Sequence, residues 1–230
     1  MLIQGQVGPQ TANTSLSAGT TPTVRLGQLG DVVVSELHGR FYEQAYRGNL
    51  FSGGIAALTS ISNATFSAAS ISATSTPIVG LWNPITSSVN CVLLQATLAI
   101  TITATTATGA GPFTWAVSTQ NSAISTGNLP LNRKTLVTSG SQVKDMSGVA
   151  LTGVTNTPVV RFGSSLGGGQ YSNASFVATA VASPTILQGF TENFDGSIII
   201  PPGGFIGLFA TATPVAHSAT SQLLWEEVPI

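Results

Sequence analysis

Ionic side chains are scarce in this chain. Its 230 residues include seven basic and eight acidic side chains, which together make up 7% of the sequence. Ordinary soluble domains carry about 25% charged residues. The formal net charge of −1 provides no electrostatic footprint for nucleic acid or for an anionic membrane surface. We therefore expect neither nucleic acid nor a membrane among the partners of this protein.

Cysteine, histidine and long apolar runs are also scarce. Cys91 is the single cysteine, so one chain cannot form an internal disulfide, and its apolar neighbours predict a buried thiol. The two histidines fall outside metal-binding spacings. These absences predict no catalytic residue, no metal site, no cofactor and no enzyme activity. No apolar run reaches the roughly 18 residues of a membrane-spanning helix, and no signal peptide is recognisable.

Apolar and neutral polar side chains make up most of the sequence. Hydrophobic residues account for 43% of it, which excludes a disordered polyelectrolyte, because such chains combine low hydrophobicity with high net charge. The surface must then consist mostly of Ser, Thr, Asn, Gln and Gly. Because charge usually keeps protein surfaces apart, we expect this surface to be covered by copies of the same chain or by a larger assembly.

Residues 89–103 carry the clearest strand pattern. An alternation of apolar and hydroxyl side chains places one face inward and the other outward. The inward set includes Leu98, Ile100 and Ile102, and the outward set includes Thr97, Thr101 and Thr103. Earlier in the same run, strict alternation groups Gln95 with the apolar Cys91 and Leu93.

The stretch 195–230 contains short apolar runs between turn signals. Asp195-Gly196 precedes the run 197–200, and Pro201-Pro202-Gly203-Gly204 separates it from the run 205–210. Both faces of the second run are apolar apart from a glycine, which predicts a strand buried on both sides. We expect a hairpin of these two runs deep in a β-sandwich, with the strand 223–230 beside it.

The N-terminal part differs from the rest. Residues 1–24 contain neither Lys nor Arg and are predicted to form an extended arm. Residues 25–52 show helical spacing of apolar side chains, with Asp31 as a possible N-cap and Gly48 as the stop signal. We predict a helix that either plugs one end of the sandwich or docks onto a partner. The candidate interface residues are Glu36, Arg40, Phe41, Tyr42, Tyr46 and Arg47.

Residues 53–230 are predicted to form the body of the protein. Short strand candidates and Gly/Pro turn signals recur at intervals that suit a sandwich. The expected fold class is therefore all-β, a jelly-roll-like β-sandwich with one short N-terminal helix. The jelly roll is the common large form of this architecture in particle-forming proteins.

Three blocks of sequence resemble virion proteins of tailed bacteriophages. The first runs from Gly27 to Phe51 and contains Phe41-Tyr42-Glu43-Gln44-Ala45-Tyr46-Arg47-Gly48. The second is Leu81-Trp82-Asn83-Pro84 followed by Val89-Asn90-Cys91-Val92-Leu93-Leu94. The third joins Pro201-Pro202-Gly203 to Leu224-Trp225-Glu226-Glu227-Val228-Pro229. The resemblance implies a jelly-roll virion structural protein of the head decoration or cement type, without catalytic residues.

This resemblance and the low charge together define the functional expectation. We expect a capsid decoration protein on the virion surface, assembled in the host cytoplasm, which bridges capsomers of the major capsid protein. Its own oligomer is expected to be a homotrimer. One alternative is a tail or head fibre, or a receptor-binding module, with aromatic loop residues such as Tyr171 stacking on sugars. Another is a major jelly-roll capsid protein, against which the uncharged arm 1–24 argues.

Overall fold

The fold was obtained as a computed structural model. It describes residues 5–6, 24–25, 40–57, 59–60, 66–67, 70–72, 74–102, 113–120, 124, 126–138, 140–163, 185–210 and 217–230. The chain separates into two compact units, Met1–Tyr42 and Glu43–Ile230. In the first unit, β1 (Gly5–Gln6) pairs in parallel with β2 (Val24–Arg25). The second unit contains the sandwich.

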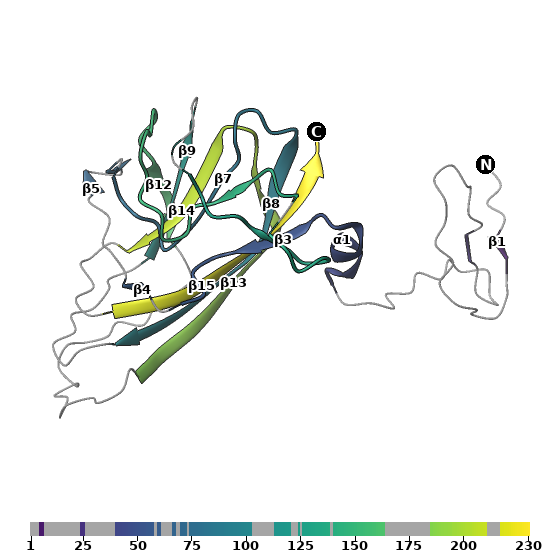
Figure 1. The fold of residues 1–230 in the computed structure, drawn as a ribbon, viewed down its shortest axis with the longest axis horizontal. Coiled ribbons are helices and arrows are strands. Elements are labelled where there is room, and N and C mark those ends of the chain that lie inside the picture. The colour runs from purple at the N-terminus through teal and green to yellow at the C-terminus, as the bar shows by residue number, and fades with distance from the viewer. Residues whose placement is uncertain are drawn as a thin grey trace. The chain divides into compact units, whose positions relative to one another are not determined.

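Two antiparallel sheets form the body (Figure 1). The first, here called the open sheet, has the strand order β10-β3-β15-β8-β13, with β4 also pairing with β15. Its strands are β3 (Leu50–Gly53), β4 (Thr59–Ser60), β8 (Val89–Ile102), β10 (Leu131–Asn132), β13 (Thr185–Ile200) and β15 (His217–Pro229).

The second sheet, here called the covered sheet, has the order β11-β7-β14-β9-β12-β6-β5. Its strands are β5 (Phe66–Ser67), β6 (Ser70–Ile71), β7 (Val79–Trp82), β9 (Phe113–Thr119), β11 (Lys144–Asp145), β12 (Val159–Gly163) and β14 (Gly204–Ala210).

The pairing of the long strands is nested. β9 pairs with β12, β8 with β13, β7 with β14 and β3 with β15, so each pair encloses the previous one in the sequence. Successive pairs lie in alternate sheets: β9–β12 and β7–β14 in the covered sheet, β8–β13 and β3–β15 in the open sheet. This wrapped antiparallel hairpin is the topology of a jelly roll. The predicted fold class is confirmed: the body is all-β, a sandwich of jelly-roll topology with very little helix.

The main core lies between the two sheets. Trp225 of β15 stacks on Phe51 of β3 with ring centroids 6.4 Å apart, and Trp115 of β9 meets Phe194 of β13 edge-on at 5.4 Å. Burial of such large side chains is the dominant favourable contribution to folding. Cys91 belongs to this core and is fully buried, as the sequence predicted, and its burial raises the pKa of the thiol.

A second apolar cluster covers the other face of the covered sheet. Phe205 and Phe209 of β14 pack there against Ile124, Met146 and Leu151 from the connecting loops. β14 is consequently buried along its whole length. The prediction that both of its faces are buried is therefore confirmed.

The predicted C-terminal hairpin is wrong. β13 ends at Ile200 and β14 begins at Gly204, but these strands lie in different sheets, so the Pro-Pro-Gly-Gly turn carries the chain from one sheet to the other. The final strand β15 lies between β3 and β8 in the open sheet, so it is in a different sheet from β14 and is not a neighbour of β13. Asp195-Gly196 does not end a strand. Both residues have positive φ, 54° and 81°, in a bulge within β13.

A one-residue bulge also corrects the expected orientation of Gln95. Leu224 and Trp225 are consecutive in β15 but pair with Gln95 and Leu93 in β8, which leaves Leu94 as the extra residue. Such a bulge reverses the side to which later side chains point. Gln95 is therefore only half-buried, while Cys91 and Leu93 are fully buried. Beyond the bulge, the predicted inward Leu98 and Ile100 are confirmed.

The structure describes part of the segment 25–52 that was predicted to be helical, namely residues 25 and 40–52. Within the described residues, α1 covers Tyr42–Arg47, and β3 begins at Leu50. Gly48 ends the helix with φ of 83°, a conformation that glycine adopts without strain. Its N–H donates to the carbonyl of Ala45 at 3.0 Å. Asp31 lies outside the described residues.

Candidate functional site

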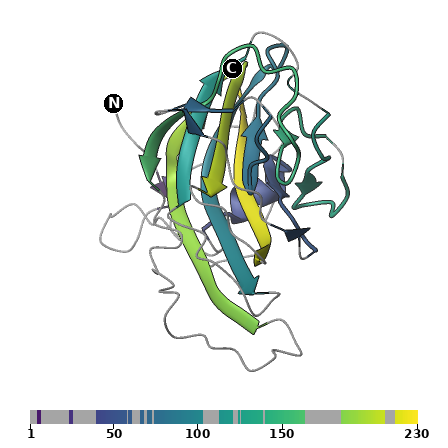
Figure 2. The same ribbon diagram turned by 90° about the vertical axis from the view of Figure 1, so that its left-hand side faces the viewer.

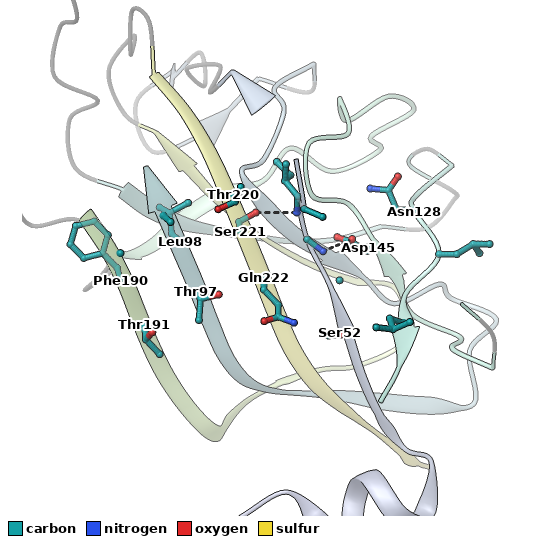
Figure 3. Close-up of a pocket in the computed structure, with 18 residues that line it drawn as sticks. Ser52, Thr97, Leu98, Asn128, Asp145, Phe190, Thr191, Thr220, Ser221 and Gln222 are labelled. Carbon is teal, nitrogen blue, oxygen red and sulfur yellow. Dashed lines mark hydrogen bonds between the residues drawn. The ribbon is translucent and has the colours of Figure 1, made fainter. Parts of the chain in front are cut away.

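The outer face of the open sheet carries neutral polar side chains. Thr97 of β8 lies opposite Thr191 of β13 on one side and Gln222 of β15 on the other. Figure 3 shows these three side chains in a row across the strands. On the same face, the Gln95 amide donates to the Asn193 side-chain oxygen at 2.8 Å. The face therefore offers hydroxyl and amide groups that can donate and accept hydrogen bonds without any net charge.

A groove of about 630 Å³ lies over this face. Small residues leave the space: Ala99 lies between Gly189 and Thr220 in the sheet, and a Cβ at Gly189 would meet no atom within 4 Å. Thr97, Thr191 and the neighbouring polar side chains line one side (Figure 3). The opposite wall comes from the segment after β3 and from the loop 128–131.

A buried carboxylate holds one end of the groove together. Asp145 of β11 is 2% exposed, and its two oxygens accept the N–H of Gly54 at 2.7 Å and the N–H of Ser147 at 2.9 Å. A Cβ at Gly53 would lie 2.6 Å from the Asp145 Cγ, so the glycine is what permits this approach. Burial raises the pKa of Asp145, although both hydrogen-bond partners act to lower it. The carboxylate thus joins the end of β3 in the open sheet to β11 in the covered sheet.

A second buried carboxylate, near the end of β15, holds the loop 141–143 that precedes β11. Glu227 is 5% exposed and accepts hydrogen bonds from the Ser141 hydroxyl, from the N–H of Gln142 at 3.0 Å and from Trp225 Nε1 at 3.4 Å. None of these donors is charged. Glu226 points to the other side of the strand, where partial burial raises its pKa and the Arg47 guanidinium partly offsets the rise.

Helix α1 and the turn 132–137 form a separate exposed surface. The Asn132 amide donates to the Gly48 carbonyl at 2.8 Å, and Lys134 Nζ lies 5.1 Å from the centroid of the Tyr46 ring. Tyr46 is nevertheless 54% exposed. These contacts hold the turn against the end of the helix.

The turn presents two bulky apolar side chains to solvent. Leu136 is 68% exposed and Val137 is 52% exposed. The Leu136 backbone is left-handed, with φ of 58°, which is unfavourable for a side chain of this size. Asn132 imposes this conformation, because its carbonyl accepts the Leu136 N–H at 2.9 Å and its N–H donates to the Val137 carbonyl at 3.0 Å. An exposed leucine held in a strained turn is a candidate contact for a partner. We call Tyr46, Leu136 and Val137 the helix-turn surface.

The predicted interface residues are distributed unevenly. Tyr46 and Arg47 lie at the end of α1, beside the turn and near Glu226. Tyr42 is exposed at the start of the helix. Arg40 and Phe41 contact each other, with the guanidinium carbon 5.2 Å from the ring centroid. Glu36 lies outside the described residues.

Sequence reasoning missed the groove and the turn. The hydroxyl face of residues 97–103 was a visible signal, but β3, β13 and β15 had to be placed beside β8 before a groove could be recognised. Asp145 carried no signal, because a single acidic residue in a Gly/Ser-rich stretch is ordinarily solvated. Leu136 was hidden for a similar reason: its strain depends on a turn whose residues match no standard turn motif.

The described residues contain no group of three or more His, Cys, Asp or Glu side chains that could hold a metal ion. None of the helices in the described part of the chain is long and apolar enough to cross a membrane. Comparison with protein-family models, curated proteins and solved structures found no match for this chain. What the geometry offers is therefore two surfaces suited to non-covalent binding, a neutral polar groove and the helix-turn surface.

Proposed function

We propose that this chain is a structural protein of a tailed-bacteriophage virion, a decoration protein that binds the head and bridges capsomers. Its mechanism is the burial of surface across the junctions of the major capsid protein. Many copies on one shell would supply avidity, so that each contact can be modest in affinity. The protein would act as a homo-oligomer.

The helix-turn surface carries this proposal. Leu136 and Val137 are the kind of apolar side chains that lie at the centre of protein interfaces, and they stand in solvent on a turn tied to the body by Asn132. Arg47 at the end of α1 can add a polar rim contact. A preformed surface of this kind loses little conformational freedom on binding, which favours affinity.

Rebinding to expanded heads that lack the protein tests the proposal. Wild-type protein is expected to bind such heads and to raise their resistance to heat. Leu136→Asn removes the apolar side chain in favour of a residue that tolerates the left-handed backbone, so it should fold normally and bind at least tenfold more weakly. Ile85→Asn, which alters an apolar residue that is 54% exposed in another loop, is the matched control and should bind like wild type. Absence of wild-type binding, with no change in shell stability, would contradict the proposal.

The groove favours a second candidate function, binding of a neutral saccharide by a fibre or receptor-binding module. Hydroxyl groups of a sugar pair well with Thr97, Thr191 and Gln222, and no charge in that row selects against a neutral ligand. A glycan array with wild-type protein and with Gln222→Ala tests this candidate. Loss of a specific glycan signal in the variant would favour it over head decoration, and a blank array would exclude it.

A further inference from the structure

Strand β13 forms one edge of the open sheet. It is the terminal strand in the order β10-β3-β15-β8-β13 and pairs only with β8 among the described residues. Its 16 residues contain Glu192 and Asp195 but no Lys, Arg or Pro. Long edge strands present rows of backbone N–H and C=O groups, and proteins usually protect them with charge, proline or a covering segment. The segment between the two bulges of β13, residues 188–193, contains no Lys, Arg or Pro, and the exposed Asp195 lies beyond it in the second bulge.

The core is incompletely covered beside this edge. Val117 of β9, Phe162 of β12, and Phe190 and Ile198 of β13 pack against the main core but are only partly buried. A groove of about 520 Å³ runs here between the end of β13 and strands β9 and β12 of the covered sheet. Figure 2 shows β12 and β13 along the same side of the sandwich. Ile199, which lines this groove, is 59% exposed. We call this region the β12–β13 seam.

The ionic side chain between the two bulges of β13 is turned away from an incoming strand, whereas Asp195 in the second bulge and Arg161 beside the seam are exposed. Glu192 accepts a hydrogen bond from Trp115 Nε1 at 3.1 Å and so points between the sheets. The side chains that β13 exposes on its outer face between the bulges are Gly189, Thr191 and Asn193, which are small and neutral. Two copies of this strand can therefore approach each other without placing like charges in opposition.

We propose that β13 pairs antiparallel with β13 of a second copy across a two-fold axis, and that this contact also covers the β12–β13 seam. An isologous contact needs one self-complementary surface, and a neutral strand edge has this property because an antiparallel pair satisfies the same hydrogen bonds in both directions. A second copy also brings its own partly buried Phe190 and Ile198 to the seam. The open sheets of the two copies then become one continuous sheet.

The symmetry distinguishes this contact from the homotrimer that the sequence analysis expects. A two-fold contact gives a dimer, or a larger assembly built from dimers. Stable specific interfaces bury about 800 Å² on each partner, and strand pairing together with the seam supplies two kinds of surface toward that total. The inference rests on the proposed function only in that the protein acts as a homo-oligomer.

Charge variants at one edge position test the proposal with the full-length protein. Thr191→Lys and Thr191→Glu each place like charges on both sides of the axis, so each alone should raise the dimer dissociation constant at least tenfold. An equimolar mixture of the two should recover a heterodimer, because the charges are then opposite. Val228→Lys, at an exposed position of β15 two strands from the edge, is the matched control and should remain dimeric. The readout is the sedimentation mass, with circular dichroism to show that each variant is folded.

Every outcome of these experiments either supports or overturns the pairing of β13 with β13 of a second copy. Dimeric wild type, weakened single variants and a recovered mixture support the proposal. A wild-type monomer or trimer overturns it, and so does a folded Thr191→Lys variant that dimerises like wild type, or a mixture that stays monomeric. Thr191→Cys adds a second measurement, since oxidation should link two copies while the buried Cys91 stays reduced. The proposed head binding is measured separately, so a monomer that still binds heads would refute this inference alone.

Discussion

The two sheets of the sandwich have the same antiparallel construction but opposite environments. The covered sheet is apolar on both faces, because loop residues such as Met146 and Leu151 pack over the side that would otherwise meet solvent. The open sheet is apolar only on its inner face, and its outer face carries Thr97, Thr191 and Gln222. The covered sheet is therefore buried on both faces, while the open sheet leaves a face and an edge available for binding.

Truncation in the outer layer of the covered sheet should have the largest effect. Phe209→Ala removes a fully buried ring from β14 and is expected to lower the free energy of unfolding by about 3–5 kcal/mol. Gln222→Ala, at an exposed position on the outer face of the open sheet, should change it by less than about 0.5 kcal/mol. Urea denaturation measures both. Similar losses in the two variants would show that both outer faces contribute to stability.

Replacing Asp145, the buried carboxylate that joins the two sheets, should have the next largest effect. Asp145→Asn keeps the shape but turns an amide N–H toward one of the two backbone donors, Gly54 or Ser147, and should cost about 1–3 kcal/mol. Asp195→Asn, at an exposed position of the β13 bulge, is the control and should cost less than about 0.5 kcal/mol.

The difference in unfolding free energy between wild type and Asp145→Asn should depend on pH. Burial raises the pKa of Asp145 above its usual value of 3.8, so the folded state binds this proton more tightly than the unfolded chain. The contribution of Asp145 is then most favourable below that value and is lost as the pH rises through the raised pKa. The difference in unfolding free energy between wild type and Asp145→Asn should decline over this interval. A difference that is constant with pH, or that grows, would contradict the assignment.

The strained turn should respond in the opposite direction. Leu136→Asn relieves a left-handed backbone with φ of 58°, and we expect a gain of about 0.5–1 kcal/mol because asparagine tolerates this region. Thermal denaturation measures the gain. Higher stability together with weaker head binding would show that the leucine is kept for contact rather than for folding. A loss of stability would mean that its side chain packs against the body.

The smallest effect is expected on the hydroxyl row itself. Thr97→Val replaces one β-branched side chain by another on the open face and should change the free energy of unfolding by less than about 0.5 kcal/mol. Its neighbour Leu98 is 2% exposed, and Leu98→Ala should cost about 2–5 kcal/mol. Adjacent residues of one strand thus report separately on the two faces of the open sheet.

Local patterns predicted part of this structure well. The burial of both faces of β14 followed from its apolar run, and the end of α1 followed from Gly48, because each depends on neighbouring residues alone. The Leu94 bulge could not be predicted, since it exists only in the register between β8 and β15. The crossing at Pro201-Pro202 was misread for the same reason: a sharp turn looks alike whether it joins strands within a sheet or between sheets.

The candidate site depended even more on long-range structure. Tyr46 and Arg47 were predicted from helical spacing, and they do lie on an exposed surface, but their neighbours Lys134 and Glu226 come from distant parts of the sequence. The groove is assembled from residues of six strands, β3, β8, β10, β11, β13 and β15, and of the loops between them, so no single stretch contains its pattern.

The nested pairing of strands also sets an order for folding. Among the four nested pairs, β9 and β12 are the closest in sequence, whereas β3 and β15 join Leu50 to Glu226. Because closing a longer loop costs more entropy, the innermost pair should form first and the outer pairs should follow in turn, in the slow range typical of non-local β topologies. Pulsed hydrogen exchange should then protect the amides of Val117 and Val159 before those of Phe51 and Trp225, and the reverse sequence would rule out this zipper.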